Sequence, residues 1–563
     1  MTARRDLLRG AVLAGSTLPL SGAAPAVAAP GGPLLFDAPT RADLARSDLA
    51  PGGLAWLGEG GRAGLFVAVA GRPPFADPHA GLVVDGARGD RHFARVWDGR
   101  TGRPEWFGAT PNVGTADCAQ AIEACVALCP VTQLGQADYF IRRTLVIDRS
   151  WRTVTGCGRY ATDEGQGTRL ILQGSAPGVH DADVLLVGSR AKPLGNSDTY
   201  PTEVHLADFT LIRDAASAPH PSGDLRRYPA GLRAAYLMHC TFSGISSLDS
   251  SVGFYFGGLV YSKVDDCLAQ RLRPGTGTGT DLAAGFFLDG TPEFGYSGGN
   301  ASLYMDRCIA IGQHARHVRP AGLIAQGAFV DSFIDRFESA RIDSGMRFVA
   351  AGAGGSGQTV DLHVRNPVLD GCGATGLELD LTGTQAASVE IVDPYIYAAG
   401  GGGAAGIAVH GGGGLVTLTG GQVHGDFRDG SLLLRQTRGV RVQGLKLHEG
   451  SRPVVVADSG ALVIEPQISN LSRATPSFAV TASNVYRSAI RPLVLGSAGR
   501  LGGGVALDAR CNFTSVDTSA VDPGCFMDVS AARKLWFGGA DASRGPGAAA
   551  FTARGNVVTG VLG

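Results

Sequence analysis

From about residue 204 onward, one short pattern of residues returns repeatedly in the sequence. It reads apolar, any, apolar, any, then a turn-type residue, with another apolar residue three places later, as in VHLADFTL (204–211), LHVRNPVL (362–369), VEIVDPYI (389–396), VTLTGGQV (416–423) and VRVQGLKL (440–447). Second strand-like segments that begin with glycine or a turn residue alternate with the first kind, such as GFYFGG, GLELDL and GIAVHG. Each unit has an apolar side that it cannot bury alone, so such units stack and share one continuous core.

The spacing of the repeat indicates the kind of stack. With the second apolar residue of the first strand as a marker, the late markers are 27, 27, 27, 24 and 21 residues apart and fall at Phe337, Val364, Ile391, Leu418, Val442 and Val463. A period in the twenties, with short strands and no sustained helical period, is typical of a solenoid. The sequence therefore predicts an all-β chain folded as a parallel β-helix.

The composition agrees with many short strands joined by tight turns. The chain has 84 glycines among 563 residues, placed between short runs of Val, Ile, Leu and Phe rather than in a collagen-like period. The formal net charge is −1 and no basic patch stands out, so nucleic acid is not an expected partner. No apolar run reaches the roughly 20 residues of a transmembrane helix, so no membrane span is expected.

The first residues resemble an export signal. Arg4 and Arg5 precede the apolar run AVLAGSTLPLSGAA, and the small-residue motif AVA (26–28) follows. This arrangement is similar to a twin-arginine signal peptide over residues 1–28. We expect export through the twin-arginine pathway and a periplasmic or secreted mature protein.

The N-terminal third resembles a known family. The segment VWDGRTGRPEWFGATPNVGTADCAQAIEACVAL (96–128) leads into ADYFIRRTLVI (137–147) and then VTGCGR (154–159). This order is similar to the entry of right-handed parallel β-helix proteins of the pectate-lyase-like superfamily, which includes phage tailspike polysaccharide depolymerases. In those proteins a PEWFGA-like lead and a helix, here roughly 115–128, cap the open end of the core.

The resemblance implies a fold, a substrate class and an assembly. Proteins of this type usually cut or modify polysaccharides, often as homotrimers, along a groove on the parallel sheets. The catalytic motifs of pectate lyases and polygalacturonases are absent from this sequence, so no mechanism is carried over by name. We expect a β-rich lead segment (29–110), a right-handed parallel β-helix with an N-terminal capping helix (111–500) and a C-terminal closing segment (501–563).

Candidate catalytic residues follow the inward markers. Asp265, Asp306, Glu338 and Arg365 each come directly after a marker and should point outward on consecutive coils. Because neighbouring strands lie about 4.8 Å apart, a stacked Asp306/Glu338 pair meets the roughly 5–10 Å between the two carboxyl groups of a glycosidase. Like charges this close favour protonation of one carboxyl, which supplies the acid, and Arg365 can hold the ionised partner or a substrate carboxylate. A solvated strand face with structural ion pairs produces the same pattern.

Two connections beside this column are candidate substrate contacts. The longest step of the series contains the insertion DGTPEFGYSGGN, and insertions in a solenoid emerge as loops, commonly on the binding face. The connection GQHARHVRP follows the next strand. We expect polysaccharide contacts from Asp289, Glu293, Phe294, Tyr296, His314, His317 and Arg341. An insertion whose Phe packs on the next coil is the alternative, and without metal-ligand spacing neither a metal nor a cofactor is expected.

Three functions remain open at this point. The simplest is a glycoside hydrolase that uses the carboxylate column. A polysaccharide lyase would instead remove a proton beside a uronate carboxyl, with Arg341, His314 or His317 as the base. A non-catalytic carbohydrate-binding β-helix predicts stacked aromatic rings without an acid pair. Aromatic residues make up 7% of the chain and few recur at one repeat position, which favours a localised active site.

Overall fold

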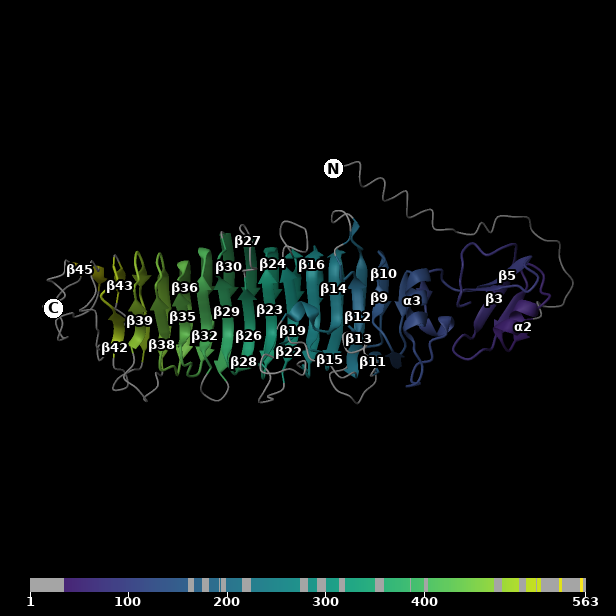
Figure 1. The fold of residues 1–563 in the computed structure, drawn as a ribbon, viewed down its shortest axis with the longest axis horizontal. Coiled ribbons are helices and arrows are strands. Elements are labelled where there is room, and N and C mark those ends of the chain that lie inside the picture. Colours follow the sequence, from purple (N-terminus) through teal and green to yellow (C-terminus); the bar gives the residue numbers. More distant parts are fainter. Residues whose placement is uncertain are drawn as a thin grey trace, which may run out of the picture. The chain divides into compact units, whose positions relative to one another are not determined.

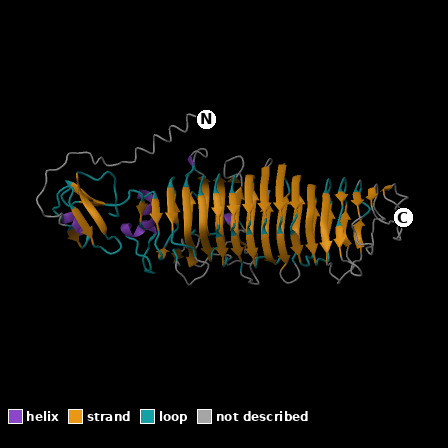
Figure 2. Cartoon of the chain, turned by 180° about the vertical axis from the view of Figure 1, so that it is seen from behind, coloured by secondary structure: helices purple, strands orange, loops and turns teal. Residues whose placement is uncertain are grey.

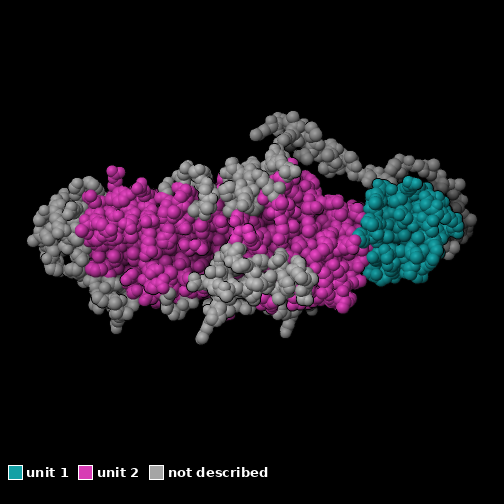
Figure 3. Space-filling view, viewed as in Figure 1, with its two compact units in different colours: residues 1–96 teal, residues 97–563 magenta. Residues whose placement is uncertain are grey.

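The computed structural model divides the chain into two compact units, residues 1–96 and 97–563 (Figure 3). The expected signal peptide lies outside the described residues. These are 35–159, 167–174, 182–191, 193, 199–214, 224–273, 282–290, 300–312, 319–349, 359–384, 386–398, 403–469, 478–495, 503–512, 514–517, 536–538 and 557–559.

The first unit is a small mixed sheet with one helix. Its strands are ordered β1-β2-β3-β5-β4, and all neighbours are antiparallel except β1 and β2. The buried side chains of Leu44, Leu57, Phe66 and Phe93 form its core. The elements are β1 (Phe36–Ala38), α2 (Arg41–Arg46), β2 (Leu54–Leu57), β3 (Gly64–Ala70), β4 (Val83–Asp85) and β5 (Arg91–Arg95).

The second unit is a right-handed parallel β-helix, which confirms the predicted fold class. Its strands form one 40-stranded sheet in which each strand pairs in parallel with strands one coil away. Figures 1 and 2 show the coils following one another in sequence order, from α3 (Ala119–Leu128) toward β45 (Val557–Thr559). Each coil contributes strands to three walls, which we call the first, second and third walls in chain order.

The walls have the following strands. The first wall contains β6 (Thr101–Gly102), β7 (Val131–Gln133), β10 (Arg152–Thr155), β17 (Lys263–Asp265), β21 (Tyr304–Asp306), β24 (Phe329–Asp335), β27 (Thr359–Arg365), β30 (Ala386–Val392), β33 (Gly413–Thr419), β40 (Ala489–Ile490), β43 (Ser515–Asp517), β44 (Trp536–Gly538) and β45, with β20 (Asn300–Ala301) leading into it. The second wall contains β8 (Asp138–Ile141), β11 (Arg169–Gln173), β18 (Leu268–Gln270), β22 (Ile309–Ile311), β25 (Glu338–Ala340), β28 (Val368–Cys372), β31 (Tyr395–Ala398), β34 (Gln422–His424) and β41 (Leu493–Leu495). Some long strands contribute to both of these walls: β13 (Val204–Asp214), β15 (Thr241–Leu248), β36 (Arg438–His448) and β38 (Val463–Ser469). The third wall contains β9 (Leu145–Ile147), β12 (Leu185–Gly188), β14 (Ala230–Met238), β16 (Val252–Val260), β19 (Leu282–Gly290), β23 (Arg319–Gly327), β26 (Ser344–Val349), β29 (Thr375–Leu381), β32 (Ala405–Gly411), β35 (Gly430–Arg435), β37 (Val454–Ala457), β39 (Phe478–Ser483) and β42 (Gly503–Leu507).

Parallel pairing extends beyond the expected limits of the β-helix at both ends. At the start, Thr101 opposes Val131, so the first pairing precedes residue 111. At the far end, Ser515 opposes Trp536, which in turn opposes Val557. After residue 500, β42 therefore continues the third wall, and β43, β44 and β45 continue the first wall.

Helix α3 packs at the end of the stack where the first coils lie (Figure 2). It begins at Ala119, within the predicted range, and its buried side chains include Ile122, Cys125 and Val126. The PEWF turn is a 3₁₀ helix, η1 (Pro104–Phe107), that packs against it. The hydroxyl of Tyr139 donates to Glu105 Oε1 at 2.5 Å and joins this turn to the second wall.

A residue in the left-handed conformation makes most of the described corners between the first and second walls. Asp208, Asn366 and Asp393 occupy this position with φ of 63°, 51° and 49°, which confirms their interpretation as turn residues. Their short polar side chains tolerate this conformation better than most. The N–H of Asn366 donates to the carbonyl oxygen of Val392 on the next coil at 2.8 Å. The corner interrupts the regular alternation of inward and outward residues, which restarts in the second wall.

Candidate functional site

The structure corrects one member of the predicted acidic column. Asp265 opposes Asp306 as expected, but Asp306 opposes Asp335 rather than Glu338. Arg365 opposes Asp335 and continues the column on the next coil. Glu338 begins β25 on the second wall, where it is exposed and opposes residues of β22 and β28. The prediction that Glu338 stacks on Asp306 is therefore wrong.

The corner explains this error. The inward marker of this coil is Ile334, whereas Phe337 is a buried residue just beyond the corner. Between them, Arg336 has a φ of 49° and turns the chain onto the second wall. Phe337 is as apolar and as buried as a true marker, so the linear pattern does not distinguish the two. The marker Val463 is also displaced, by one residue on the same strand, from the buried Ile464 that opposes Val442.

The outer face of the first wall carries two parallel columns of side chains. Residues two apart on a strand share a face, so each strand contributes one side chain to each column. We call the first the ring column, which contains Lys263, Tyr304, Phe333, His363 and Glu390. The second is the acid column, which contains Asp265, Asp306, Asp335 and Arg365.

The three central members of the ring column, Tyr304, Phe333 and His363, form a stack of aromatic side chains. The rings of Tyr304 and Phe333 lie 5.2 Å apart at 3°, and those of Phe333 and His363 lie 4.7 Å apart at 10°. Tyr304 is 45% exposed. At the far end, His363 Nδ1 lies 3.0 Å from Glu390 Oε2. The stack offers a partly exposed apolar strip along the axis of the β-helix.

Sequence reasoning missed this strip. Tyr304, Phe333 and His363 are 29 and 30 residues apart. A marker at Phe337 shifts the repeat by three residues on this coil and places Phe333 out of line with the other two rings. Once β24 is placed by Ile334, the three rings fall at one repeat position. The available signal was the outward residue before each marker, in Tyr-Met-Asp, Phe-Ile-Asp and His-Val-Arg.

Arginines at the corners bridge the acid column. Arg307 donates from Nη2 to Asp265 Oδ1 at 2.9 Å, and Arg336 donates to Asp306 from Nε at 3.0 Å and from Nη2 at 2.5 Å. Asp335 accepts a hydrogen bond of 3.2 Å from Asn366 Nδ2, and the nearest nitrogen of Arg336 is 3.8 Å away. The side chain of Asp335 is 42% exposed, against 24% for Asp306 and 13% for Asp265. Asp335 is therefore the most exposed and the least strongly paired carboxylate of the column.

The carboxyl groups at two ends of the columns, Asp265 and Glu390, have lowered pKa values. Partial burial acts to raise the pKa of Asp265, but hydrogen bonds from Arg307 and Lys263 outweigh it and lower that pKa. The hydrogen bond with His363, followed by the charges of His363 and Arg365, lowers the pKa of Glu390. Neither group is suited to be a catalytic acid, because an acid must carry a proton at working pH.

The ion pair of Asp265 predicts a specific acid sensitivity. Since its pKa is lowered from an ordinary value of 3.8, its contribution to stability is present above about pH 4 and is lost as the pH falls through the lowered pKa. We expect Asp265→Asn to lower the unfolding temperature at neutral pH and to flatten its decline in acid. Thermal scans across pH of the wild type, this variant and the exposed second-wall control Asp370→Asn measure the difference. Identical curves for wild type and Asp265→Asn would remove any stabilising role from the pair.

The structure places two other predicted contacts, Arg341 and Asp289, away from the first wall. Arg341 lies at the corner between the second and third walls, where its N–H donates to the carbonyl oxygen of Asp370 at 3.1 Å. Asp289 lies on the third wall, is fully buried and accepts a hydrogen bond of 2.6 Å from the hydroxyl of Tyr255. The remaining predicted contacts lie outside the described residues: Glu293, Phe294, Tyr296, His314 and His317.

Asp289 belongs to a buried polar network on the third wall. Arg233 donates from Nε to Asp183 Oδ2 at 2.9 Å, and its guanidinium carbon lies 4.0 Å from the centre of the Tyr255 ring. Burial, followed by the charge of Asp289, raises the pKa of Tyr255. The side chains of Asp183 and Asp289 are buried and the charges are paired, so the network has the character of a structural contact rather than an open site.

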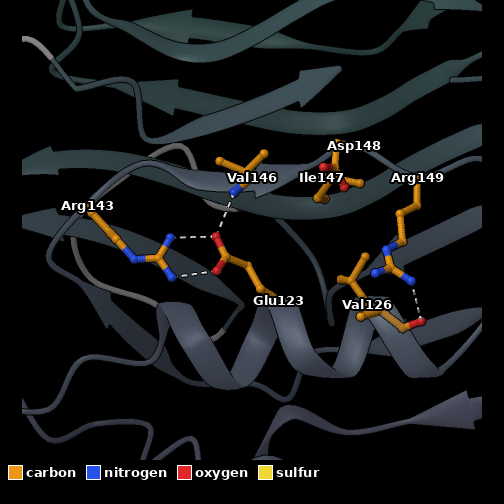
Figure 4. Close-up of a pocket in the computed structure, with 8 residues that line it drawn as sticks. Glu123, Val126, Arg143, Val146, Ile147, Asp148 and Arg149 are labelled. Atoms are coloured by element: carbon orange, nitrogen blue, oxygen red, sulfur yellow. Dashed lines mark hydrogen bonds and ion pairs between the residues drawn. The ribbon is translucent and has the colours of Figure 1, made fainter. Parts of the chain in front are cut away.

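A pocket of about 370 Å³ lies between α3 and β9 (Figure 4). Glu123 accepts two hydrogen bonds from the guanidinium group of Arg143, at 2.6 and 2.5 Å, and one of 3.1 Å from the N–H of Val146. Arg149 reaches the carbonyl oxygen of Ala127 at 3.5 Å. These contacts join the capping helix to the first coils, and the pocket contains none of the predicted site residues.

The described residues contain no group of three or more His, Cys, Asp or Glu side chains arranged to hold a metal ion. Among the same residues, no helix has the length and apolar character needed to cross a membrane.

Comparison with known proteins supports the fold. No protein-family model matches this sequence, and no curated protein matches it either. The tailspike protein of E. coli bacteriophage HK620, solved with a pentasaccharide, is similar in structure, with a TM-score of 0.56 and 12% identity over 83% of this chain and 82% of that chain. A mutant of that tailspike with a hexasaccharide has a TM-score of 0.52 and 11% identity over 80% of this chain and 76% of that one.

Bacteriophage CBA120 tailspike protein 2 is a more distant match. Its enzymatically active domain has a TM-score of 0.36 and 13% identity over 86% of this chain. The match spans 58% of that domain and 52% of the full-length tailspike. The HK620 matches, at 11–12% identity, show that the chain shares the parallel β-helix fold of that tailspike.

Proposed function

We propose that this protein is an exported enzyme that degrades polysaccharide on the outer face of its first wall, most simply as a glycoside hydrolase. The observation that carries the proposal is the ring column beside the acid column. Aromatic rings bury the apolar faces of sugars at low entropic cost, and carboxylates two residues further along each strand reach the same bound chain. The HK620 tailspike, which shares the fold, was solved with bound oligosaccharides, the ligand class proposed here.

Asp306 and Asp335 are the proposed catalytic pair. They oppose each other on adjacent strands, whose spacing of about 4.8 Å places them near the roughly 5 Å separation of retaining glycosidases. Arg336 donates to Asp306 from two nitrogens and orients this carboxylate, which we assign as the nucleophile. Asp335 is the more exposed and more weakly paired of the two, and we assign it as the general acid. Asp265 and Arg365 then contact the substrate.

Two observations favour alternatives. His363 is held by Glu390 at 3.0 Å beside Arg365, which suits a lyase that uses His363 as the base and Arg365 against a uronate carboxylate. The stacked rings themselves suit a non-catalytic binding protein, since the carboxylates could serve only in ion pairs. Each alternative uses the same face of the first wall.

Incubation with a panel of bacterial and plant polysaccharides tests the proposal. The mature protein is followed for new reducing ends and for the ultraviolet absorbance of an unsaturated uronate. Reducing ends without absorbance support the hydrolase, and reducing ends with absorbance support the lyase. Retained binding without either product supports the non-catalytic protein and rejects an enzyme.

The ring column makes a separate prediction about substrate binding. Replacing Tyr304 or Phe333 with Ala removes one stacking partner worth about 1 kcal/mol. We expect KM for polysaccharide to rise roughly fivefold with kcat little changed. Steady-state kinetics measure the two constants. A fall in kcat at constant KM would mean that the rings do not act as a binding strip.

Export through the twin-arginine pathway and assembly as a homotrimer remain part of the proposal. Fractionation of cells that express the full chain tests the first, with Arg4→Lys/Arg5→Lys as the variant expected to stay in the cytoplasm. Light scattering of the mature protein measures the second.

A further inference from the structure

A second group of aromatic side chains lies on the second wall. Its strands are β31, β34, β36 and β38, and we call the group formed by Tyr395, Tyr397, His424 and His448 the second-wall platform. Tyr397 opposes His424, which opposes His448 on the following coil. The ring column of the first wall ends on the coil where this platform begins, because Glu390 and Tyr395 flank the same corner.

Two rings of the platform stack along the axis of the β-helix, and a third lies tilted against them. His424 and His448 lie 4.5 Å apart at 15°, and Tyr395 lies 5.6 Å from His424 at 41°. Tyr397 is 43% exposed, and Tyr395, His424 and His448 are partly buried. The platform therefore repeats, on another wall, the partly exposed apolar strip of the ring column.

Polar side chains follow the rings on the same wall. Tyr395 opposes Gln422, and the next two coils place Lys446 and Gln467 in the same column. The amide groups of Gln422 and Gln467 can both donate hydrogen bonds to hydroxyl groups and accept hydrogen bonds from them. The ammonium group of Lys446 can only donate. A column of rings beside a column of hydrogen-bonding groups fits a neutral sugar chain that lies along the wall.

The two histidines are positioned by neighbours rather than by a metal. Ser469 Oγ lies 2.7 Å from His448 Nδ1, and Gln422 Oε1 lies 3.2 Å from His424 Nε2. Imidazole lone pairs lie in the ring plane, so two nearly parallel stacked rings cannot direct them at one ion between them. This geometry leaves the ring faces and edges as the binding elements.

The histidine stack also gives the platform a pH dependence. Burial, and next the charge of His424, lower the pKa of His448 from its ordinary value of 6.5, with Lys446 acting in the same direction and Glu449 against it. Tyr395 and Ser469 also contact the pair. The lowered pKa means that the packing around His448 favours its neutral ring, so protonation of His448 in acid weakens the stack.

We propose that the second-wall platform is a second carbohydrate-binding site, which takes a neutral oligosaccharide and acts without cleaving it. The site uses none of the residues assigned to catalysis, so it does not depend on the first wall being an active site. A chain held on two walls would be bound more tightly than by either wall alone.

Calorimetric titration with neutral hexasaccharides of glucose, mannose and galactose tests the platform directly. The double variant Tyr397→Ala/His424→Ala is expected to bind the preferred sugar about tenfold or more weakly, because two stacking partners are lost. Its cleavage of short soluble substrate is expected to stay within about twofold of wild type. The matched control Tyr304→Ala/Phe333→Ala should instead raise KM. His448→Gln keeps a polar side chain of similar size and should weaken the loss of affinity on acidification from about pH 7.5 to 5.5.

Several results would overturn the platform. Unchanged binding of every sugar by the double variant would do so, as would the absence of binding by the wild type. A change in the oligomeric state of the double variant, seen by light scattering, would identify the platform as a contact between copies of the chain. Because binding is measured rather than product, failure of the proposed enzyme activity leaves a positive binding result intact.

Discussion

Replacing Asp335 with Asn is expected to lower kcat for polysaccharide cleavage by about 10²–10⁴-fold, the usual contribution of a general acid. Asn has nearly the same shape but cannot donate the proton that the leaving oxygen requires. Asp335 is 42% exposed and only weakly paired, so the change should leave the fold and KM nearly unaltered. Reducing-end assays with the purified variant measure the effect, and thermal scans check that the variant and the wild type have the same unfolding temperature.

Glu338→Gln is the discriminating comparison. The linear repeat predicts that Glu338 is catalytic, whereas the strand register places it on the second wall. We expect Glu338→Gln to keep activity close to that of the wild type. If Glu338→Gln abolishes cleavage and Asp335→Asn does not, the acid column is not the active site. Asp306→Asn should be as damaging as Asp335→Asn, because the two carboxyl groups act in one reaction.

Phe286→Ala is expected to reduce the free energy of unfolding by about 3–5 kcal/mol, as large-to-small changes of a buried Phe do. Phe286 is fully buried in the third wall. Its ring stacks on that of Phe254 at 4.8 Å and 8° and meets Phe337 edge-on at 5.7 Å and 84°. Removing the ring leaves a cavity between three coils that cannot collapse without moving their strands. Denaturant unfolding, followed by circular dichroism, measures the loss.

Tyr304→Ala is the matched control for this change. It removes a ring of similar size from a stack on the outer face, where 45% of the residue is exposed. We expect its cost to stay within about 0.5 kcal/mol, as for most surface changes. Equal costs for the two variants would mean that the inner aromatic stack does not contribute to the stability of the β-helix.

Local patterns in the sequence were sufficient for the fold class, and the family resemblance added the capping helix. Apolar residues alternate within each strand, and the pattern returns at a period in the twenties. Stacked coils bury all of these apolar faces in one core, and the signal for this arrangement lies within each strand. The sequence also predicts the helix at Ala119–Leu128 and the turns at Asn366 and Asp393, because each of these depends on nearby residues alone. Asp265, Asp306 and Arg365 were placed in one column for the same reason.

Which outward side chains meet became clear from the pairing of the strands in three dimensions. Register between coils depends on where each corner falls, and an apolar residue on either side of a corner is equally buried, as Ile334 and Phe337 are. A register error of three residues on this coil put Glu338 in the column where Asp335 lies. The same error left the stacking of Phe333 between Tyr304 and His363 unrecognised. Hydrogen bonding between parallel strands sets the register of Phe333 to Asp335, and this information is spread over residues about 30 apart rather than held in any one segment.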